Sequence, residues 1–216
     1  MTITIAKDLR ANFGPARDQD PRPTCMAFAA SDAHAGVRPG WEPLSVEWAY
    51  YHALKREGAR PHEGIRFGTM LATLRGDGQP VETHWPYINS MFTDFSTWTP
   101  PPSAASLFRR DNVPLAATVD DLFDRLDHDT PVLFTMSISP AFYLPDHHGV
   151  VAGNEPLMPN RVHALVAVGH GYRGSDRFIL VRNSWGVDWG LAGHAWVGTA
   201  YLKPRFLVAA VMGGEL

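Results

Sequence analysis

Residues 182–190 of this chain read RNSWGVDWG, and they come directly after the apolar run Phe178–Val181, which has the composition of a buried β-strand. Asn183 offers a side-chain amide oxygen just after that strand, where it can accept a hydrogen bond from an imidazole N–H. An Asn-Ser-Trp-Gly sequence followed closely by Trp-Gly after an apolar strand is an uncommon combination, so it is the most specific signal in the chain. It predicts a strand whose end presents Asn183 to a histidine elsewhere in the fold.

Outward from this strand, helices are expected in the first half of the chain and strands in the second. Helices are predicted from Cys25 to about His34, from Val46 to Glu57, from about Thr69 to Arg75 and around Val119–Leu126. Strands are predicted for Val132–Ile138, Val162–Val168, Phe178–Val181 and Ala195–Val197. Thr24 and Ser45 are the expected N-caps of the first two helices. A helical half followed by a strand-rich half predicts an α+β fold with two unlike lobes.

The length of 216 residues allows one large domain or two lobes of roughly 100 residues each. Residues 85–114 have no regular pattern, and the proline run Pro100–Pro102 within them is the candidate boundary between lobes. We expect residues 1–112 to form a helical left lobe, with an N-terminal segment that crosses to the other lobe, and residues 113–216 to form the right lobe.

Composition excludes several classes of function. A net charge of −3 with 45% hydrophobic and 19% charged residues is typical of an ordinary globular protein, and no basic cluster with interleaved aromatics indicates a nucleic-acid partner. No apolar run approaches the roughly 20 residues that span a bilayer, so no membrane partner is expected. The adjacent His147 and His148 cannot easily face one ion, and no metal or cofactor is expected. The single cysteine and the absence of a secretory signal predict a cytoplasmic protein.

The residues needed for nucleophilic catalysis are all present. Cys25, in the first turn of its predicted helix, lies where the helix dipole lowers a thiol pKa. His163 stands inside the apolar strand Val162–Val168, where a titratable ring is out of keeping with its surroundings. Asn183 can orient that ring, and the side-chain amide of Gln19 with the backbone N–H of Cys25 can form an oxyanion hole. Taken singly, Cys25 and His163 would be ordinary core residues, so it is the combination that favours catalysis.

Three blocks in this order, Gln19–Phe28, Val162–Gly171 and Arg182–Gly190, resemble those of the papain-like cysteine peptidases of the C1 type. Leu44–Glu47 and the Trp85-Pro86-Tyr87 run also match, as do Ala195–Val197 and the following residues as far as Leu202, so the resemblance covers essentially the whole chain. The chain resembles a bacterial variant of this family without a prosegment or disulfides.

The resemblance implies one catalytic domain with a helical left lobe bearing the Cys25 helix, a β-barrel right lobe and an active-site cleft between them. It implies a thiol hydrolase that cleaves a protein or peptide substrate, with Cys25 as nucleophile and His163 as base and later acid. Asn183 would orient His163, Gln19 would stabilise the oxyanion, and Trp185 would shield the Asn183–His163 hydrogen bond. Expected substrate-binding residues are Gly64, Pro23 and Trp185.

The chain departs from the family pattern beside the nucleophile. Asp20 and Pro23 stand where the family has glycines, which is expected to alter the wall of the S1 region. Only 24 residues precede Cys25, too few for a long inhibitory prosegment. Control is therefore expected from a regulatory or inhibitory protein partner, from an occluding loop such as His147–Val150, or from narrow specificity.

Two alternatives to hydrolysis remain. The same catalytic residues could transfer the acyl group to an acceptor other than water, as a peptide ligase or cyclase does, because both reactions share the thioester. A catalytically weak papain-like binding protein is the other alternative, and Asp20 and Pro23 give it some support.

Overall fold

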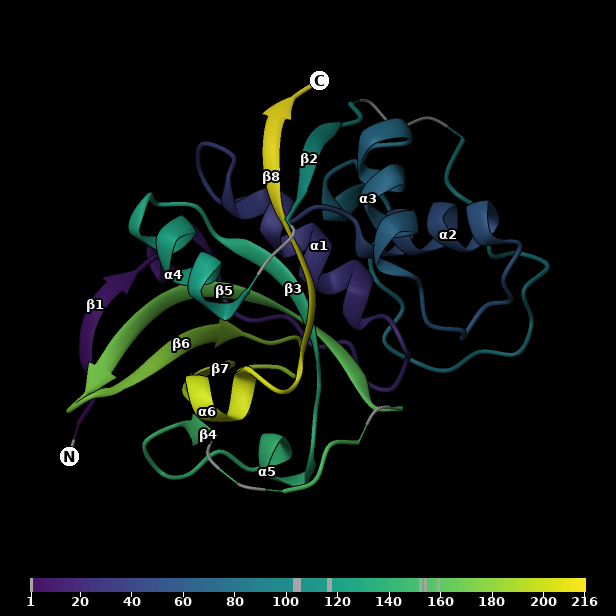
Figure 1. Ribbon diagram of the computed structural model, residues 1–216. Helices are drawn as coiled ribbons and strands as arrows, with labels where there is room; N and C mark the ends of the chain where they lie inside the picture. Colours follow the sequence, from purple (N-terminus) through teal and green to yellow (C-terminus); the bar gives the residue numbers. More distant parts are fainter. Residues whose placement is uncertain (1, 103–105, 116–117, 152, 154, 159) are drawn as a thin grey trace.

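A computed structural model describes residues 2–102, 106–115, 118–151, 153, 155–158 and 160–216 (Figure 1). The helices are α1 (Cys25–Gly36), α2 (Val46–Glu57), α3 (Phe67–Gly76), α4 (Val119–Asp127), α5 (Pro140–Tyr143) and α6 (Thr199–Leu202), with 3₁₀ turns at Arg10–Asn12 and Glu82–His84. The strands are β1 (Thr4–Asp8), β2 (Arg110–Leu115), β3 (Val132–Ser137), β4 (Val150–Val151), β5 (Val162–Arg173), β6 (Asp176–Arg182), β7 (His194–Gly198) and β8 (Phe206–Glu215). Helices α2 and α3 lie on one side of α1 and the sheet lies on the other (Figure 1).

Local signals explain the two long helices at the start of the chain. The Ser45 hydroxyl caps α2 by accepting a hydrogen bond from the backbone N–H of Trp48 at 3.1 Å, and Gly58 ends the helix with a left-handed φ of 62°. Alanine-rich α1 is buried along nearly its whole length, which lets the sheet approach it closely. Thr24 occupies the N-cap position of α1 as predicted, but its side chain does not cap the helix. Its hydroxyl instead hydrogen-bonds to the Tyr87 hydroxyl at 2.9 Å.

The sheet has the order β2-β8-β3-β5-β6-β7-β4, with β1 added antiparallel to β5. Strands β2 and β4 do not pair with each other, so the sheet of the described residues does not close into the β-barrel that the resemblance implied. The reason is the course of β8, which pairs with β3 through its first half and with β2 through its second half. Strand β2 also packs against α3, so the sheet extends toward the helices at this end instead of closing.

Long-range pairing creates elements that the sequence pattern did not predict. Strand β1 pairs with the second half of β5, which is five residues longer than predicted. Strands β2 and β8 were not predicted, and Pro114 lies within β2, an edge strand that tolerates a residue without an N–H. The predicted boundary between residues 112 and 113 falls inside β2. The division into two lobes at that point stays a prediction.

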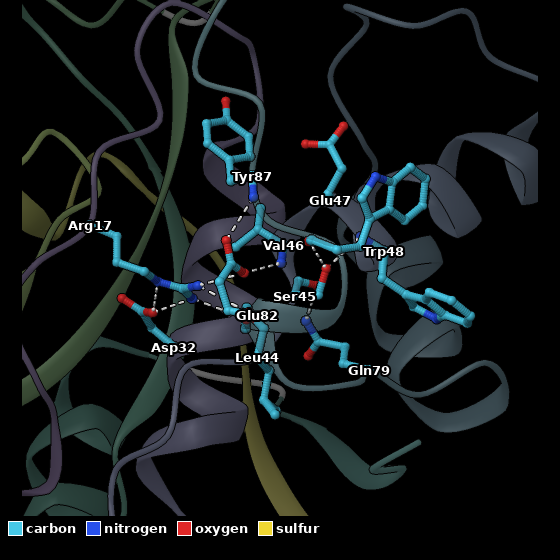
Figure 2. Close-up of polar contacts among 12 residues, drawn as sticks. Arg17, Asp32, Leu44, Ser45, Val46, Glu47, Trp48, Gln79, Glu82 and Tyr87 are labelled. Carbon is cyan, nitrogen blue, oxygen red and sulfur yellow. Dashed lines mark hydrogen bonds and ion pairs between the residues drawn. The ribbon is translucent and has the colours of Figure 1, made fainter. Parts of the chain in front are cut away.

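A buried ion cluster joins α1 to the sheet. Asp32 of α1 accepts hydrogen bonds from Arg17 at 2.6 Å and from Arg182 of β6 at 2.7 Å. Figure 2 shows Arg17 reaching both Asp32 and Glu82, and Glu82 in turn accepts hydrogen bonds from the backbone N–H groups of Val46 and Tyr87. One cluster thus connects α1, the sheet, the start of α2 and the segment around Tyr87. No helix in the described part of the chain has the length and apolar character needed to cross a bilayer.

Candidate active site

Cys25 is the first residue of α1 and is half-buried, although its thiol is densely surrounded by protein atoms. Burial raises the pKa of this thiol, while the backbone N–H groups of Ala164, Met26 and Cys25 itself lower it by stabilising the thiolate. Helix α1 packs against β5, and Ala164, whose N–H acts on the thiol, directly follows His163 in that strand. The structure therefore brings the Cys25 and His163 segments together, although they are far apart in the sequence.

His163 and Asn183 form a buried pair. The Nε2 atom of His163 lies 2.7 Å from the Oδ1 atom of Asn183, and the two residues are only 4% and 2% exposed. Burial lowers the pKa of His163 to about 4, and the hydrogen bond to Asn183 acts in the opposite direction. The Asn183 oxygen also accepts the backbone N–H of Ser184 at 2.8 Å, which fixes the orientation of the amide. This arrangement holds the ring of His163 by Nε2 and leaves Nδ1 for a second partner.

Aromatic rings enclose the His163 side chain. The Trp185 ring lies 4.7 Å from the His163 ring between centroids, and Phe142 of α5 lies 5.9 Å from it. Trp189 packs against both Phe142 and Trp185, and Tyr143 stacks on Trp185 with an interplanar angle of 11°. The cluster excludes water from one side of His163, which explains the direction of its pKa shift.

Gln19 is linked to the Asn183 segment by direct hydrogen bonds. Its backbone N–H donates to the Ser184 carbonyl at 2.9 Å, and its Oε1 accepts from the Ser184 hydroxyl at 2.7 Å. One N–H of its side-chain amide donates to the Arg22 carbonyl at 3.0 Å, so the second N–H remains for another acceptor. Ser184 was not predicted to take part in the site, although it stands in the RNSWGVDWG motif next to Asn183. Its position is the signal that could have identified it.

A surface pocket adjoins this arrangement. It is lined by residues 18–22 together with Tyr143 and Trp185, so Gln19 and Trp185 share one cavity and Asp20 forms part of its wall. Pro23, which is half-buried, is not among the residues that line it, although it lies two positions from Cys25. Gly64 is exposed, and a Cβ at that position would meet no heavy atom within 4 Å. Gly64 does not line the pocket among the described residues, and its substrate-binding role stays a prediction.

The predicted occluding loop lies elsewhere. His147, His148 and Val150 line a different cavity, whose other walls include Ile5 and Trp196. Among the described residues, this loop has no hydrogen bond to the four predicted catalytic residues. Within the same part of the chain, no group of three His, Cys, Asp or Glu side chains could hold a metal ion.

Sequence comparison supports the predicted resemblance over part of the chain. The sequence model described as "Papain family cysteine protease" matches residues 98–202, a range that includes His163 and Asn183 and excludes Cys25 and Gln19. "Probable cysteine protease RDL6" of Arabidopsis thaliana is 39% identical over 59 residues, which are 27% of this chain and 17% of that protein. The chain thus matches about a sixth of the length of this curated relative.

Solved structures extend the likeness to nearly the whole fold. Xylellain, a cysteine protease from Xylella fastidiosa, superposes with a TM-score of 0.76 at 21% identity over 98% of this chain and 87% of xylellain. Bromelain protease from Ananas comosus, solved with the inhibitor E64, superposes with a TM-score of 0.73 at 17% identity over 95% of this chain and 97% of bromelain. The match to the family model and the shared fold confirm the predicted resemblance to the papain-like cysteine peptidases.

Proposed function

We propose that this protein is a thiol peptidase that hydrolyses peptide bonds in a protein or peptide substrate through an acyl-enzyme on Cys25. The single observation that carries the proposal is the buried hydrogen bond of 2.7 Å between His163 and Asn183, on a strand that lies against the Cys25 thiol. Such a pair supplies an oriented base beside a nucleophile, which is what acyl transfer by a thiol requires. The family match over residues 98–202 supports the same reaction class.

In the proposed first step, the Cys25 thiol gives its proton to His163 and its sulfur attacks the carbonyl carbon of the scissile peptide bond. The carbonyl oxygen gains the negative charge, and the free N–H of the Gln19 amide and the backbone N–H of Cys25 stabilise it. His163 then delivers its proton to the leaving nitrogen as the C–N bond breaks. A thioester remains on Cys25, and the amine product departs.

The second step reverses these proton movements. A water molecule gives a proton to His163 and attacks the thioester carbonyl carbon, and the same donors stabilise the oxyanion. The C–S bond then breaks, the carboxylic acid product leaves, and the proton returns from His163 to the sulfur. Asn183 keeps the ring oriented in both steps through Nε2, because a ring that turned would lose its alignment with the sulfur.

The ionisation of the Cys25 thiol and that of the His163 imidazole depend on each other. Burial raises the pKa of Cys25 and lowers that of His163 to about 4, so each group alone is held neutral. Proton transfer between them creates opposite charges that stabilise each other in a region of low dielectric constant. The thiolate is therefore expected to form only together with the His163 imidazolium.

The test combines alkylation with cleavage. The purified protein is treated with iodoacetamide or an epoxysuccinyl inhibitor between about pH 4 and pH 9, and alkylation is expected well below the pKa of about 8.5 of a free thiol. Peptide libraries are incubated with the unmodified protein and with Cys25→Ala, and products are weighed by mass spectrometry. Hydrolysis adds one water to the two fragments, whereas ligation joins fragments without it.

Alkylation that rises only near the pKa of a free thiol, together with intact peptides, would overturn the proposal. Cleavage that persists in Cys25→Ala would also overturn it, because the nucleophile would then lie elsewhere. Joined products instead of hydrolysed ones would move the assignment to a ligase or cyclase with the same site.

A further inference from the structure

Arg22, three residues before Cys25, has a side chain buried as completely as any in the core. Its guanidinium forms two parallel hydrogen bonds with the Glu47 carboxylate, from Nη1 to Oε2 at 2.7 Å and from Nη2 to Oε1 at 2.9 Å. Both side chains are 0% exposed. This geometry uses the planar fork of arginine, which lysine cannot reproduce.

Aromatic rings surround the guanidinium. Its carbon lies 5.0 Å from the Tyr87 ring centroid and 5.1 Å from that of Phe92, and the rings of Tyr50 and Trp98 lie within 5.9 Å. A buried ion pair costs desolvation energy, so its presence is weak support for a role in stability alone. The pair does, however, restrict the position of the Arg22 backbone, because its two hydrogen bonds hold the guanidinium in one orientation.

The Glu47 carboxylate extends the same network to a distant segment. It accepts the indole N–H of Trp98 at 2.6 Å and the backbone N–H of Ile88 at 3.1 Å, while Arg22 donates to the Ile88 carbonyl at 2.9 Å. Glu47 belongs to α2, and Figure 2 shows it on the side of that helix near Trp48 and Tyr87. Helix α2 and the segment from Ile88 to Trp98 thus hold Arg22 from two directions.

The backbone of Arg22 carries this constraint to Gln19. The Arg22 carbonyl accepts the side-chain amide of Gln19 at 3.0 Å, and it also accepts the backbone N–H of Thr24 at 2.8 Å. The Arg22 N–H donates to the Gln19 carbonyl at 3.1 Å, and the Tyr87 hydroxyl donates to that carbonyl at 2.7 Å. The Gln19 amide is therefore oriented by a carbonyl whose own position is set by the buried pair.

We propose that Arg22, anchored by Glu47, is a positioning residue for the oxyanion donor Gln19. The inference rests on the proposed function, since it gives the buried pair a role in the oxyanion step of that reaction. Arg22 does not touch the substrate in this role; it acts through Gln19. Loss of the anchor leaves the Cys25–His163 pair in place and lets the Gln19 amide drift from the reacting oxygen.

The test is a cycle of variants with two readouts. The double change Arg22→Met with Glu47→Gln removes the buried charges together and keeps an acceptor for Trp98. We expect kcat for peptide hydrolysis to fall about tenfold, because a displacement of a fraction of an ångström at a catalytic group has effects of this order. KM is expected to change little. Alkylation of Cys25 by iodoacetamide should keep its rate and pH profile, since that displacement generates no oxyanion.

The same double change made in Gln19→Ala is expected to lower kcat less than about twofold, because the group that Arg22 positions is then absent. Arg110→Gln is the matched control: Arg110 is a buried arginine that donates to Gly213 and Glu215, away from the site. Any loss of kcat in this control should be the same with and without Gln19. If the double variant does not fold, Arg22→Lys serves in its place, with a smaller loss and the same dependence on Gln19.

A full tenfold loss that persists in Gln19→Ala would overturn the inference, and so would a parallel fall in alkylation rate. Both outcomes would mean that the pair supports the fold in general. These results leave the proposed function intact, because the unmodified protein would still cleave peptides. A complete absence of turnover in the unmodified protein would overturn the proposed function and this inference with it.

Discussion

The Nε2 atom of His163 lies 2.7 Å from the Oδ1 atom of Asn183, and this hydrogen bond is buried under the Trp185 ring. The side-chain NH₂ group of Asn183 has no hydrogen-bond partner among the described residues. A buried amide that leaves its donors unused is costly, so its orientation must be determined by its acceptor oxygen. The Asn183 oxygen accepts hydrogen bonds from the His163 Nε2–H and from the Ser184 N–H, and it therefore fixes the orientation of the imidazole ring.

Replacing Asn183 with alanine is expected to lower kcat for peptide hydrolysis by about ten- to a hundredfold, because loss of one partner from a buried hydrogen bond costs about 1–3 kcal/mol. KM should change less, since Asn183 is only 2% exposed. Asn112→Ala is the matched control: the Asn112 side chain donates to the Leu71 carbonyl of α3, away from His163. Equal kcat values for Asn183→Ala and Asn112→Ala would contradict an orienting role.

Trp185 and Tyr143 offer a second comparison: their rings stack on each other, and of the two described rings it is Trp185 that packs against His163. Trp185→Ala should admit water to His163 and relieve the burial that lowers its pKa, so that the pKa moves up from about 4 toward its ordinary value. The measurement is the lower limb of the pH profile for Cys25 alkylation. Tyr143→Ala leaves Trp185 in place, and the same limb should stay where it is in the unmodified protein. Identical shifts in both variants would mean that Trp185 has no special part in shielding.

The parts of the fold that were predicted correctly have local causes. Ser45 and Gly58 mark the ends of α2 by capping, and the apolar runs in β3 and β6 can only be buried. Strand β8 was missed because its burial does not alternate along the chain: Leu207 and Val208 are exposed, whereas Ala209–Met212 are buried. Pairing with β2 and β3 is what makes it a strand. Thr24 has the residue type of a cap, yet Tyr87, 63 positions away, takes its hydroxyl.

The candidate site shows the same division. Cys25, His163 and Asn183 could be picked out because their types and order fit one chemistry, and the structure brings their segments together. The Arg22–Glu47 pair could not, since nothing in the sequence links an arginine to a glutamate 25 positions later. The open sheet was missed for a similar reason, because closure depends on where the edge strands meet other elements.

Asp32 is expected to be critical for stability, because its carboxylate is shared between Arg17 and Arg182 inside the protein. Burial raises the pKa of Asp32, but the two guanidinium groups outweigh it and hold the pKa below its ordinary value. Asp32→Asn leaves the buried Arg182 without its counter-ion and leaves Arg17 with Glu82 as its remaining partner. We expect a loss of about 3–5 kcal/mol in the free energy of unfolding, measured with urea at pH 7.5. Asp77→Asn removes the more exposed pair with Arg56 and should cost at most about 1 kcal/mol. Similar losses in the two variants would show that burial of the Asp32 cluster has no energetic consequence.

The stability of the protein should fall as the pH is lowered from about 6.5, and buried histidines are the reason. Burial lowers the pKa of His34, His163 and His194 to about 4 in each case. Between the unfolded value near 6.5 and this folded value, the unfolded chain binds protons that the folded chain does not, so stability is full above pH 6.5 and is lost on acidification. Each histidine contributes up to about 1.4 kcal/mol per pH unit in that window. Urea unfolding at pH 8, 6.5 and 5 measures how steeply the free energy of unfolding falls with pH. His34→Gln should reduce this slope, whereas replacing the exposed His128 with Gln should leave it unchanged. A free energy of unfolding that stays level from pH 8 to pH 5 would mean that the buried rings take up protons in the folded protein.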